Sequence, residues 1–279
     1  MQPSNPIEIP ELTDSILTLL IKNITAINPN LSEGVYLTGS IPLNDFYSNK
    51  SDIDFVILCR NLPDEEDVKQ LERIHKKIRN QFKRPKLSGV YLTREGLQVS
   101  NQQTIKVPSV FEGKMNKMLW GQGLRLTAVT LKELKTTALT ICGLPAHNLP
   151  IEIKDEDLNR VLFENINSYW RNWLRKHSQF NHRYFLLVVL PWLTEWSVLG
   201  VARQLHTLKT GQITSKLHAG YYALEILPQK FHHIIQQAIK IRQRDKKLSH
   251  ISPSIKRAKQ TIECVRFVIE EFNRVYNSR

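Results

Sequence analysis

The hydrophobic positions in the first half of the chain alternate between two spacings. A helical spacing runs from Leu12 to Ile27, and extended apolar runs follow at Val35–Thr38, Ile53–Cys59 and Ser88–Thr93. Between the last two runs, Pro63–Glu66 opens a segment whose apolar residues recur every three or four positions, which predicts a helix. We therefore predict a strand, helix, strand order in this half of the chain.

The pattern is weaker after Pro108. Leu124–Thr130 is predicted as a further strand and Leu131–Thr140 as a helix. Gly143 and Pro145 then interrupt the pattern, as residues at a domain boundary commonly do.

The rest of the chain has helical spacing almost throughout. We therefore predict an α+β fold, with an N-terminal α/β domain that contains a small mixed sheet over residues 1–149 and an all-α helical bundle over residues 150–279. The helices predicted in the bundle are Asp155–Lys176, Arg183–Leu208, Ser215–Ile226, Gln229–Arg244 and Ser254–Tyr276.

Composition narrows the kinds of partner. Lys and Arg outnumber Asp and Glu by 39 to 26, and the net charge of +13 favours polyanionic partners such as nucleotides and, at low salt, nucleic acid. Charge alone does not choose between them. The most apolar stretch, Phe185–Leu193, is too short to span a membrane and contains Pro191, so we predict a buried helix. The N-terminus has no export signal, which predicts a cytoplasmic protein. No Cys/His spacing is typical of a zinc site.

Two short motifs stand at the ends of adjacent predicted strands. Gly39-Ser40 follows the first strand, and Asp52 and Asp54 stand at the start of the second. Side chains two apart on a strand leave the same face, so both carboxylates aim at one point. Their oxygens are suitable ligands for Mg²⁺ at that point. Gly39 lets a triphosphate approach the backbone, and Ser40 offers a hydroxyl and an amide to phosphate oxygens. We predict a nucleotide and metal site here, with Asp52 and Asp54 as its catalytic residues.

Taken singly, Gly-Ser is a common turn and Asp-Ile-Asp is a common strand edge. In this order, with a strand on either side and a polar loop between them, the motifs resemble the signature of the polymerase-beta-like nucleotidyltransferase superfamily. The resemblance implies that an attacking hydroxyl displaces pyrophosphate from a nucleoside triphosphate.

A second resemblance comes from the helical half. Glu195–Lys216 contains an Arg, Thr-Gly and Lys pattern, and Ala223–Pro228 follows it. Together with the N-terminal motifs, this pattern is similar to the streptomycin and spectinomycin 3''-adenylyltransferases over most of the chain. The resemblance implies ATP as the substrate, a role in aminoglycoside antibiotic resistance, and Arg203 and Lys216 as residues that reach the ATP phosphates across an interdomain cleft.

The acceptor in that family is an aminoglycoside or spectinomycin, held by acids and aromatic residues between the domains. The resemblance therefore implies a small cationic acceptor. The nearest candidates here are Glu112, Trp192, Glu195 and Trp196, with Phe111 beside Glu112. For Trp192 and Trp196 the alternative role is core packing at helical spacing.

Two positions depart from the family pattern. The family has a catalytic glutamate at the start of the strand that here reads Leu87–Thr93, and the matching residue is Ser88. A serine hydroxyl is too weak a base at neutral pH to accept the proton of a sugar hydroxyl. Glu95 lies too far along the strand to replace it. The family's nucleotide-stacking tyrosine is replaced by Arg242.

We predict a monomeric, Mg²⁺-dependent enzyme that transfers AMP from ATP to a hydroxyl of a small cationic acceptor. The alternative is a degenerate relative that binds nucleotide as a sensor, and Ser88 is its main support. An RNA-modifying transferase would also use the basic charge. The sequence shows no RNA-binding motif or aromatic-basic stripe, so nucleic acid is not an expected partner. A membrane is not an expected partner either, because the most apolar stretch is too short to span one.

Overall fold

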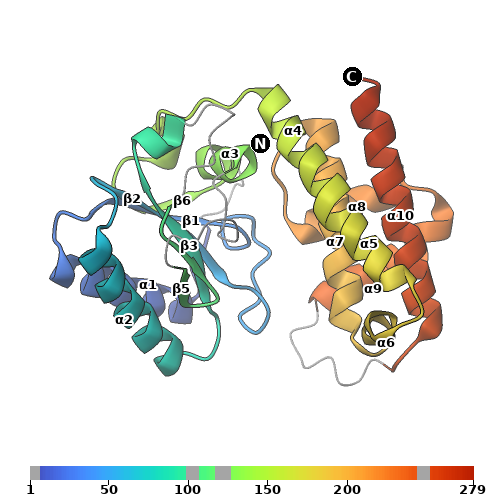
Figure 1. Ribbon diagram of the computed structural model, residues 1–279, viewed down its shortest axis with the longest axis horizontal. Helices are drawn as coiled ribbons and strands as arrows, with labels where there is room; N and C mark the ends of the chain where they lie inside the picture. The colour runs from blue at the N-terminus through green and yellow to red at the C-terminus, as the bar shows by residue number, and fades with distance from the viewer. Residues whose placement is uncertain (1–6, 99–106, 117–126, 244–251) are drawn as a thin grey trace. The chain divides into compact units, whose positions relative to one another are not determined.

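The computed structural model describes residues 7–98, 107–116, 127–243 and 252–279 (Figure 1). The chain divides into two compact units, Met1–Ile153 and Lys154–Arg279, a few residues after the boundary that we predicted between residues 149 and 150. The first unit is built around a mixed sheet and the second is helical. The predicted α+β fold class is confirmed.

The first unit contains a six-stranded sheet with the strand order β5-β4-β3-β2-β1-β6. β2 and β3 pair in parallel and are connected by α2 (Glu65–Gln81), whereas the other neighbouring strands pair antiparallel. The strands are β1 (Ser32–Thr38), β2 (Ile53–Cys59), β3 (Leu87–Thr93), β4 (Ser109–Phe111), β5 (Lys114–Asn116) and β6 (Leu139–Cys142).

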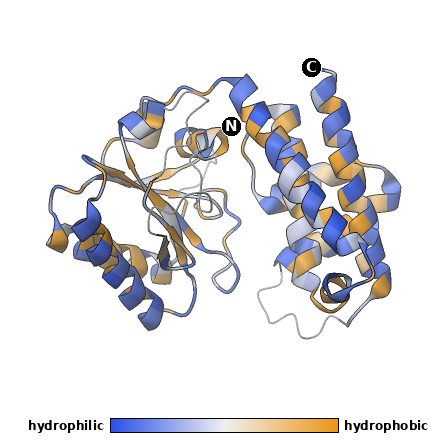
Figure 2. Cartoon of the chain, viewed as in Figure 1, coloured by the Kyte–Doolittle hydropathy of each residue, from blue (hydrophilic) through white to orange (hydrophobic). Residues whose placement is uncertain are grey.

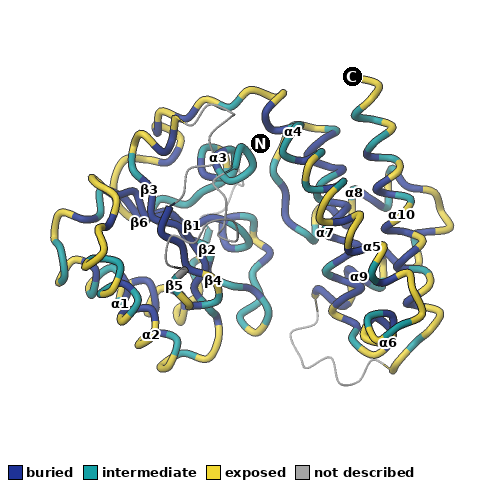
Figure 3. The backbone as a smooth tube through the Cα atoms, in the orientation of Figure 1, coloured by how far each residue is buried: buried dark blue, intermediate teal, exposed yellow. Residues whose placement is uncertain are grey.

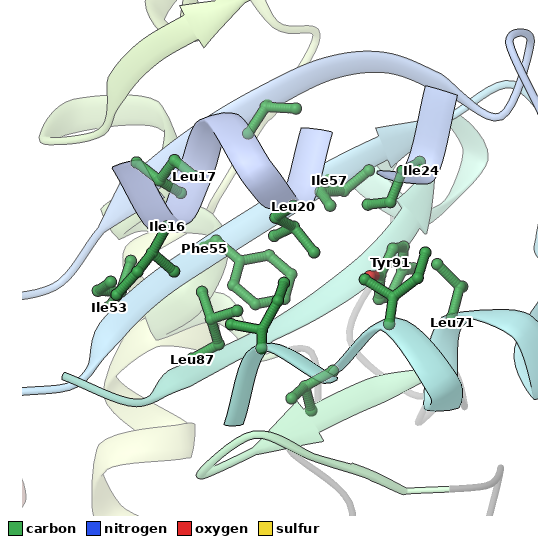
Figure 4. Close-up of a cluster of buried hydrophobic side chains, with 14 of the residues drawn as sticks. Ile16, Leu17, Leu20, Ile24, Ile53, Phe55, Ile57, Leu71, Leu87 and Tyr91 are labelled. Carbon is green, nitrogen blue, oxygen red and sulfur yellow. The ribbon is translucent and has the colours of Figure 1, made fainter. Parts of the chain in front are cut away.

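One face of the sheet carries the larger apolar core. Alternate residues of the strands, such as Phe55 and Tyr91, point toward α1 (Glu11–Ile27) and α2 (Figure 4). There they pack with Leu20 of α1 and Leu71 of α2, all of them buried. The outer surface of α2 is largely hydrophilic (Figure 2), so this helix has the amphipathic pattern that predicted it.

The opposite face of the sheet is covered by α3 (Ala128–Thr136). Val56 of β2 packs there in a core that includes Leu131 and Leu134. Asp54 stands two residues before Val56 and therefore leaves β2 on the same face. The period of the strand thus separates the candidate site from the core beneath α1 and α2.

The structure differs from the prediction after Pro108. Where the sequence predicts a strand up to Thr130, α3 has already begun, because the Thr127 side chain accepts a hydrogen bond from the Thr130 N–H and caps the helix. Residues 124–126 of that predicted strand lie outside the described residues. The helix predicted up to Thr140 ends earlier, and β6 pairs with β1 instead. The β4 and β5 strands are too short to carry a readable alternation, so the sequence did not predict them.

The second unit is a bundle in which α7 packs against α8, α9 and α10. Figure 3 shows buried residues along the inward faces of these helices and exposed residues outside. α4 continues through a π-helical turn, Ile166–Trp170, into α5. The helices are α4 (Asp155–Asn165), α5 (Arg171–Ser178), α6 (His182–Val189), α7 (Pro191–Thr210), α8 (Lys216–Ile226), α9 (His232–Gln243) and α10 (Ile255–Asn277).

The single helix predicted over Arg183–Leu208 is in fact two helices. Leu190 is extended and Pro191 begins α7, because proline disfavours a helical residue before it and has no N–H to donate. The apolar stretch is also not fully buried, since the Phe185 side chain is 62% exposed. No single helix in the described part of the chain is long and apolar enough to cross a membrane, and α6 and α7 meet that criterion only as a pair bent by 96°.

His75 of α2 lies inside the first core. Its Nε2 makes a hydrogen bond of 2.7 Å with the Tyr91 hydroxyl, and its ring stacks on Phe55. Burial lowers the pKa of His75 from 6.5 to about 3, because the apolar surroundings disfavour the charged ring. The folded protein therefore keeps His75 neutral at mildly acidic pH.

This burial predicts a pH-dependent stability. Between pH 6.5 and about 3 the unfolded chain binds a proton at His75 that the folded chain does not. The free energy of unfolding should therefore fall with decreasing pH in this window, by up to about 1.4 kcal/mol per pH unit from this group. His75→Gln keeps a hydrogen-bonding partner for Tyr91 but does not titrate. Urea unfolding over this range should show a shallower slope for His75→Gln, and equal slopes would contradict the prediction.

Candidate active site

Gly39 begins the turn that follows β1. Its φ of +70° lies in the left-handed region that favours glycine, and a Cβ at this position would overlap Oδ2 of Asp54. The backbone of the turn and the Asp54 carboxylate are thus in direct contact. Any side chain at residue 39 would displace the carboxylate, so the glycine is required by the site as well as by the turn.

Ser40 is the polar residue of this turn. Its Oγ is buried and has no hydrogen-bond partner among the described residues, while its carbonyl accepts a 2.8 Å hydrogen bond from the Asp45 N–H. A buried hydroxyl without a partner costs about 1–3 kcal/mol unless a ligand satisfies it. The turn is therefore held by its backbone and leaves the hydroxyl for a ligand.

The amide of Gly39 already binds an anionic oxygen. Its N–H donates a 2.9 Å hydrogen bond to Oε1 of Glu133, a residue of α3. The carboxylate occupies the position that a phosphate oxygen would take in a turn that binds phosphate through its amides. Sequence patterning missed Glu133 because its contact with Gly39 joins distant parts of the chain.

Asp54 lies in β2, and Asp52 immediately precedes that strand. Asp54 pairs in register with Thr38 of β1 and Ser88 of β3. Asp52, just before β2, accepts hydrogen bonds from Ser88 Oγ at 3.2 Å and from an Arg84 Nη at 3.3 Å. Burial raises the pKa of Asp52, and the bond from Ser88 and the charge of Arg84 oppose that rise. A cation between the two carboxylates would favour their ionised form.

This donor set suits a magnesium ion. Mg²⁺ takes hard oxygen ligands and often binds through one or two carboxylates, with water and substrate phosphates completing its shell. The described residues contain no group of three or more His, Cys, Asp or Glu that could hold a metal, as zinc sites commonly need. The two aspartates therefore fit a metal that arrives with a phosphorylated substrate.

Ser88 is tied to the hairpin of β4 and β5. Its Oγ accepts a 3.1 Å hydrogen bond from the backbone N–H of Glu112, in the turn of that hairpin. The Glu112 carboxylate in turn binds Lys86 Nζ at 2.6 Å, which lowers its pKa. The structure thus brings Glu112, a predicted acceptor contact, beside Ser88 and Asp52. Phe111, its neighbour, is 56% exposed.

One buried carboxylate of the helical unit lies against Lys216, a predicted phosphate contact, and Arg242. Oε1 of Glu195 in α7 lies 3.4 Å from Lys216 Nζ and 3.6 Å from an Arg242 Nη. Burial lowers the pKa of Lys216, Glu195 raises it in part, and Arg242 and Arg203 lower it further. Glu195, predicted to contact the acceptor, is engaged with these cations in this structure.

Arg242 also belongs to this cluster. The sequence indicated only that it stands where the family has a tyrosine. It is 6% exposed and stands three and seven residues after Ile239 and Ile235, on the buried face of α9. An arginine on the apolar face of an amphipathic helix needs a buried partner. The place of Arg242 on this apolar face could have predicted a buried acidic partner from the sequence. The partner in the structure, Glu195, lies on another helix.

The two predicted tryptophans have different surroundings. Trp196 packs among aromatic rings, with centroids 4.7 Å from Trp170, 6.1 Å from Trp173 and 5.9 Å from Tyr169. Trp192, at the start of α7, is 45% exposed. Trp196 is thus half-buried among aromatic rings, while Trp192 presents its ring to solvent.

Residues 151–268 match the family model described as aminoglycoside adenylyltransferase, C-terminal domain. The match covers most of the helical unit, Lys154–Arg279. No curated protein sequence matches the chain.

A solved structure is similar over nearly the whole chain. It is the spectinomycin adenyltransferase AAD(9) from Enterococcus faecialis, crystallised with ATP and spectinomycin. The match has a TM-score of 0.66 and 13% sequence identity, and it covers 93% of this chain and 99% of that one. The likeness shows a shared fold. With the family match, it confirms the predicted resemblance to aminoglycoside adenylyltransferases.

The contact between Gly39 and Asp54 leads to a stability prediction. Gly39→Ala should destabilise the protein by the strain of a left-handed alanine, about 1–2 kcal/mol, plus about 1–3 kcal/mol for overpacking against Asp54. Gly211→Ala is the matched control, because Gly211 has a φ of +69° and nothing lies within 4 Å of its added Cβ. Differential scanning calorimetry of both variants checks this. Equal losses of stability would contradict the proposed contact.

Proposed function

We propose that this chain, whose helical unit matches the model of the aminoglycoside adenylyltransferase C-terminal domain, is a Mg²⁺-dependent nucleotidyltransferase that transfers AMP from ATP to a hydroxyl of a small acceptor. One observation carries the proposal: the Asp54 carboxylate lies against a turn whose buried Ser40 hydroxyl has no partner among the described residues. In the reaction the acceptor oxygen bonds to the α-phosphorus and the bond to pyrophosphate breaks. The proton of the hydroxyl passes to a base.

The turn after β1 is the proposed site for the triphosphate. Ser40 Oγ gains the acceptor that it lacks, and the Gly39 N–H exchanges the Glu133 oxygen for a phosphate oxygen. The exchange replaces one anionic oxygen by another, so the amide already has the orientation that phosphate needs. Backbone donors of this kind hold phosphate without charged side chains.

Asp52 and Asp54 are the proposed magnesium ligands. Mg²⁺ supplies neutralisation of charge on the phosphoryl oxygens when it is bound. Ser88 and Arg84 hold the Asp52 carboxylate in place, and the register of β2 holds Asp54 two residues away on the same face. The residues thus position the phosphate for attack, which supplies most of the rate gain in this class of reaction.

The cluster around Glu195 is the proposed second group of phosphate ligands. Lys216 and Arg242 lie against the Glu195 carboxylate, and the positive charge of Arg203 lies close enough to Lys216 to lower its pKa. Glu195 orients Lys216 and Arg242 at low exposure, where charges act more strongly than in water. We assign Arg203 and Lys216 to the triphosphate and Glu195 to the positioning of the cations.

The proposed acceptor is small, bears a hydroxyl and is of the aminoglycoside type. The similar structure AAD(9) was crystallised with spectinomycin. Exposed side chains that favour such a ligand are Trp192, which offers an apolar ring, and Glu112, which offers a carboxylate. Trp196 supports the position of α7 through its aromatic neighbours.

A second candidate function is nucleotide binding without transfer. It is favoured by Ser88, whose hydroxyl is engaged with Asp52 and with the Glu112 N–H and is too weak a base for the reaction. Such a protein would retain the Gly39 turn, the aspartates and the cation cluster as a sensor site.

A binding and transfer experiment separates the two functions. Calorimetric titration with ATP should give saturable binding that depends on Mg²⁺. Incubation with α-labelled ATP and streptomycin, spectinomycin or a pool of cell metabolites should then yield a labelled product and pyrophosphate. Binding without a labelled product from any acceptor would refute the transfer and leave the sensor function.

The metal assignment has its own test. Asp52→Asn with Asp54→Asn removes both negative charges with little change of shape and should weaken Mg²⁺-dependent ATP binding at least about tenfold, which corresponds to about 1.4 kcal/mol. Asp14→Asn, on the exposed face of α1, is the control and should bind as the parent does. Unchanged binding in the double variant would mean that the aspartates are not the metal ligands.

A further inference from the structure

We infer that Glu112 is the general base that accepts the proton of the attacking hydroxyl. Ser88, which stands where the family has its catalytic glutamate, is too weak a base for this role. The inference rests on the proposed nucleotidyl transfer. It concerns a carboxylate that comes from the neighbouring hairpin rather than from β3 itself. Five observations support it: the turn geometry, the link through Ser88, the ionised and accessible carboxylate, the order of groups across the sheet and the engagement of the competing carboxylate Glu133.

The turn between β4 and β5 holds Glu112 in a strained conformation. Glu112 has a φ of +48° and Gly113 a φ of +73°, and left-handed backbone is unusual for glutamate. Two-residue hairpin turns of this kind favour Asn, Asp or Gly at both positions. The turn is anchored to β3 by the Gly113 N–H, which donates to the Leu87 carbonyl at 2.7 Å, and to α2 by Arg79, which donates to the Gly113 carbonyl. A strained residue held by several anchors is typical of a functional position.

Ser88 links this turn to the metal-binding carboxylate. Its Oγ donates to Asp52 Oδ2 at 3.2 Å and accepts from the Glu112 N–H at 3.1 Å. One hydroxyl thus fixes both Asp52 and the backbone of Glu112. We assign Ser88 as a positioning residue, because it orders the two acidic residues and takes no proton itself.

The Glu112 carboxylate is ionised and accessible. Lys86 Nζ holds Oε2 at 2.6 Å, and the side chain of Glu112 is 44% exposed. No described residue is bonded to Oε1, so this oxygen remains for a donor that arrives from solvent, and the lysine keeps the group in the ionised form that can accept a proton.

The order of groups across the sheet agrees with in-line attack. From β1 outward lie the Gly39 turn, then Asp54 on β2, then Ser88 on β3, then Glu112 at the end of β4. In phosphoryl transfer the attacking and leaving oxygens lie on opposite sides of the phosphorus. If the phosphates lie at the Gly39 turn, the attacking hydroxyl comes from the side of Glu112.

Glu133 is the other carboxylate near the Gly39 turn that could act as the general base. It lies at the opposite edge of this row, where its Oε1 accepts the Gly39 N–H. That position is on the phosphate side of Asp54, so Glu133 is placed for the leaving group rather than for the nucleophile. The same geometry that favours Glu112 therefore disfavours Glu133.

The proposed step balances without a further reagent. The hydroxyl oxygen forms a bond to the α-phosphorus, and the bond from that phosphorus to the bridging oxygen breaks. The electron pair of the broken bond leaves with pyrophosphate. The hydroxyl proton passes to Oε1 of Glu112 and from there to solvent.

The main test compares Glu112→Gln with Glu33→Gln in the full chain, using α-labelled ATP and whichever of streptomycin, spectinomycin or the metabolite pool the parent modifies. Glu112→Gln should lower kcat at least about 10²-fold and leave the Kd for ATP with Mg²⁺ unchanged, because a base acts only on the chemical step. Glu33→Gln is the control, since Glu33 pairs with Arg60 and Arg94 at the other end of β1. It should keep the parent kcat.

Chemical rescue supplies a readout that a structural role would not give. Glu112→Ala should be inactive, and added formate, a small carboxylate, should restore a saturable part of kcat. Calorimetry should show both Glu112 variants folded, because the side chain is partly exposed.

The outcomes distinguish this inference from the proposed function. A parent chain that modifies no acceptor refutes the transfer and the base together. An active parent with an equally active Glu112→Gln refutes only the base, as does a Glu112→Ala variant that formate leaves inactive. A Glu133→Gln variant that alone loses kcat would assign the base to Glu133.

Discussion

The contact between the backbone of Gly39 and the carboxylate of Asp54 is the constraint on which the rest of the site depends. It exists because residue 39 has no side chain and takes a left-handed φ. The contact sets the distance between a turn with phosphate-type donors and a pair of metal-type ligands. β1 and β2 are neighbours in the sheet, so the same strand pairing that builds the core also builds the site.

The site residues leave the sheet on the face opposite the larger core. Phe55 and Tyr91 fill the space beneath α1 and α2, and the alternation of the strands directs Asp54 and Ser88 to the other side. Burial of the apolar face therefore fixes the direction of the acidic face. A shift of β2 by one residue would exchange the two faces, so the core protects the geometry of the site.

The helical unit holds positively charged side chains at low exposure. Lys216 and Arg242 are held at low exposure, where a charge without a partner would be strongly unfavourable. Glu195 pairs with both of them, and Arg203 adds a further positive charge near Lys216. Across the sheet, the replacement of a strand carboxylate by Ser88 is accompanied by a carboxylate on the adjacent turn, which is the basis for the role assigned to Glu112.

The sequence by itself determined the features that depend on local spacing. Periodicity predicted β2, α2 and the helical bundle, and the order of Gly39-Ser40 and Asp52-Ile53-Asp54 indicated the superfamily. Only the tertiary structure decided that Glu195 is paired with Arg242, that β6 joins the sheet beside β1, and that Glu112 lies next to Ser88. The reason is physical: local spacing shows which face a side chain leaves, whereas partners distant in sequence are chosen by chain pairing and by the burial of charge, which no short window of sequence contains.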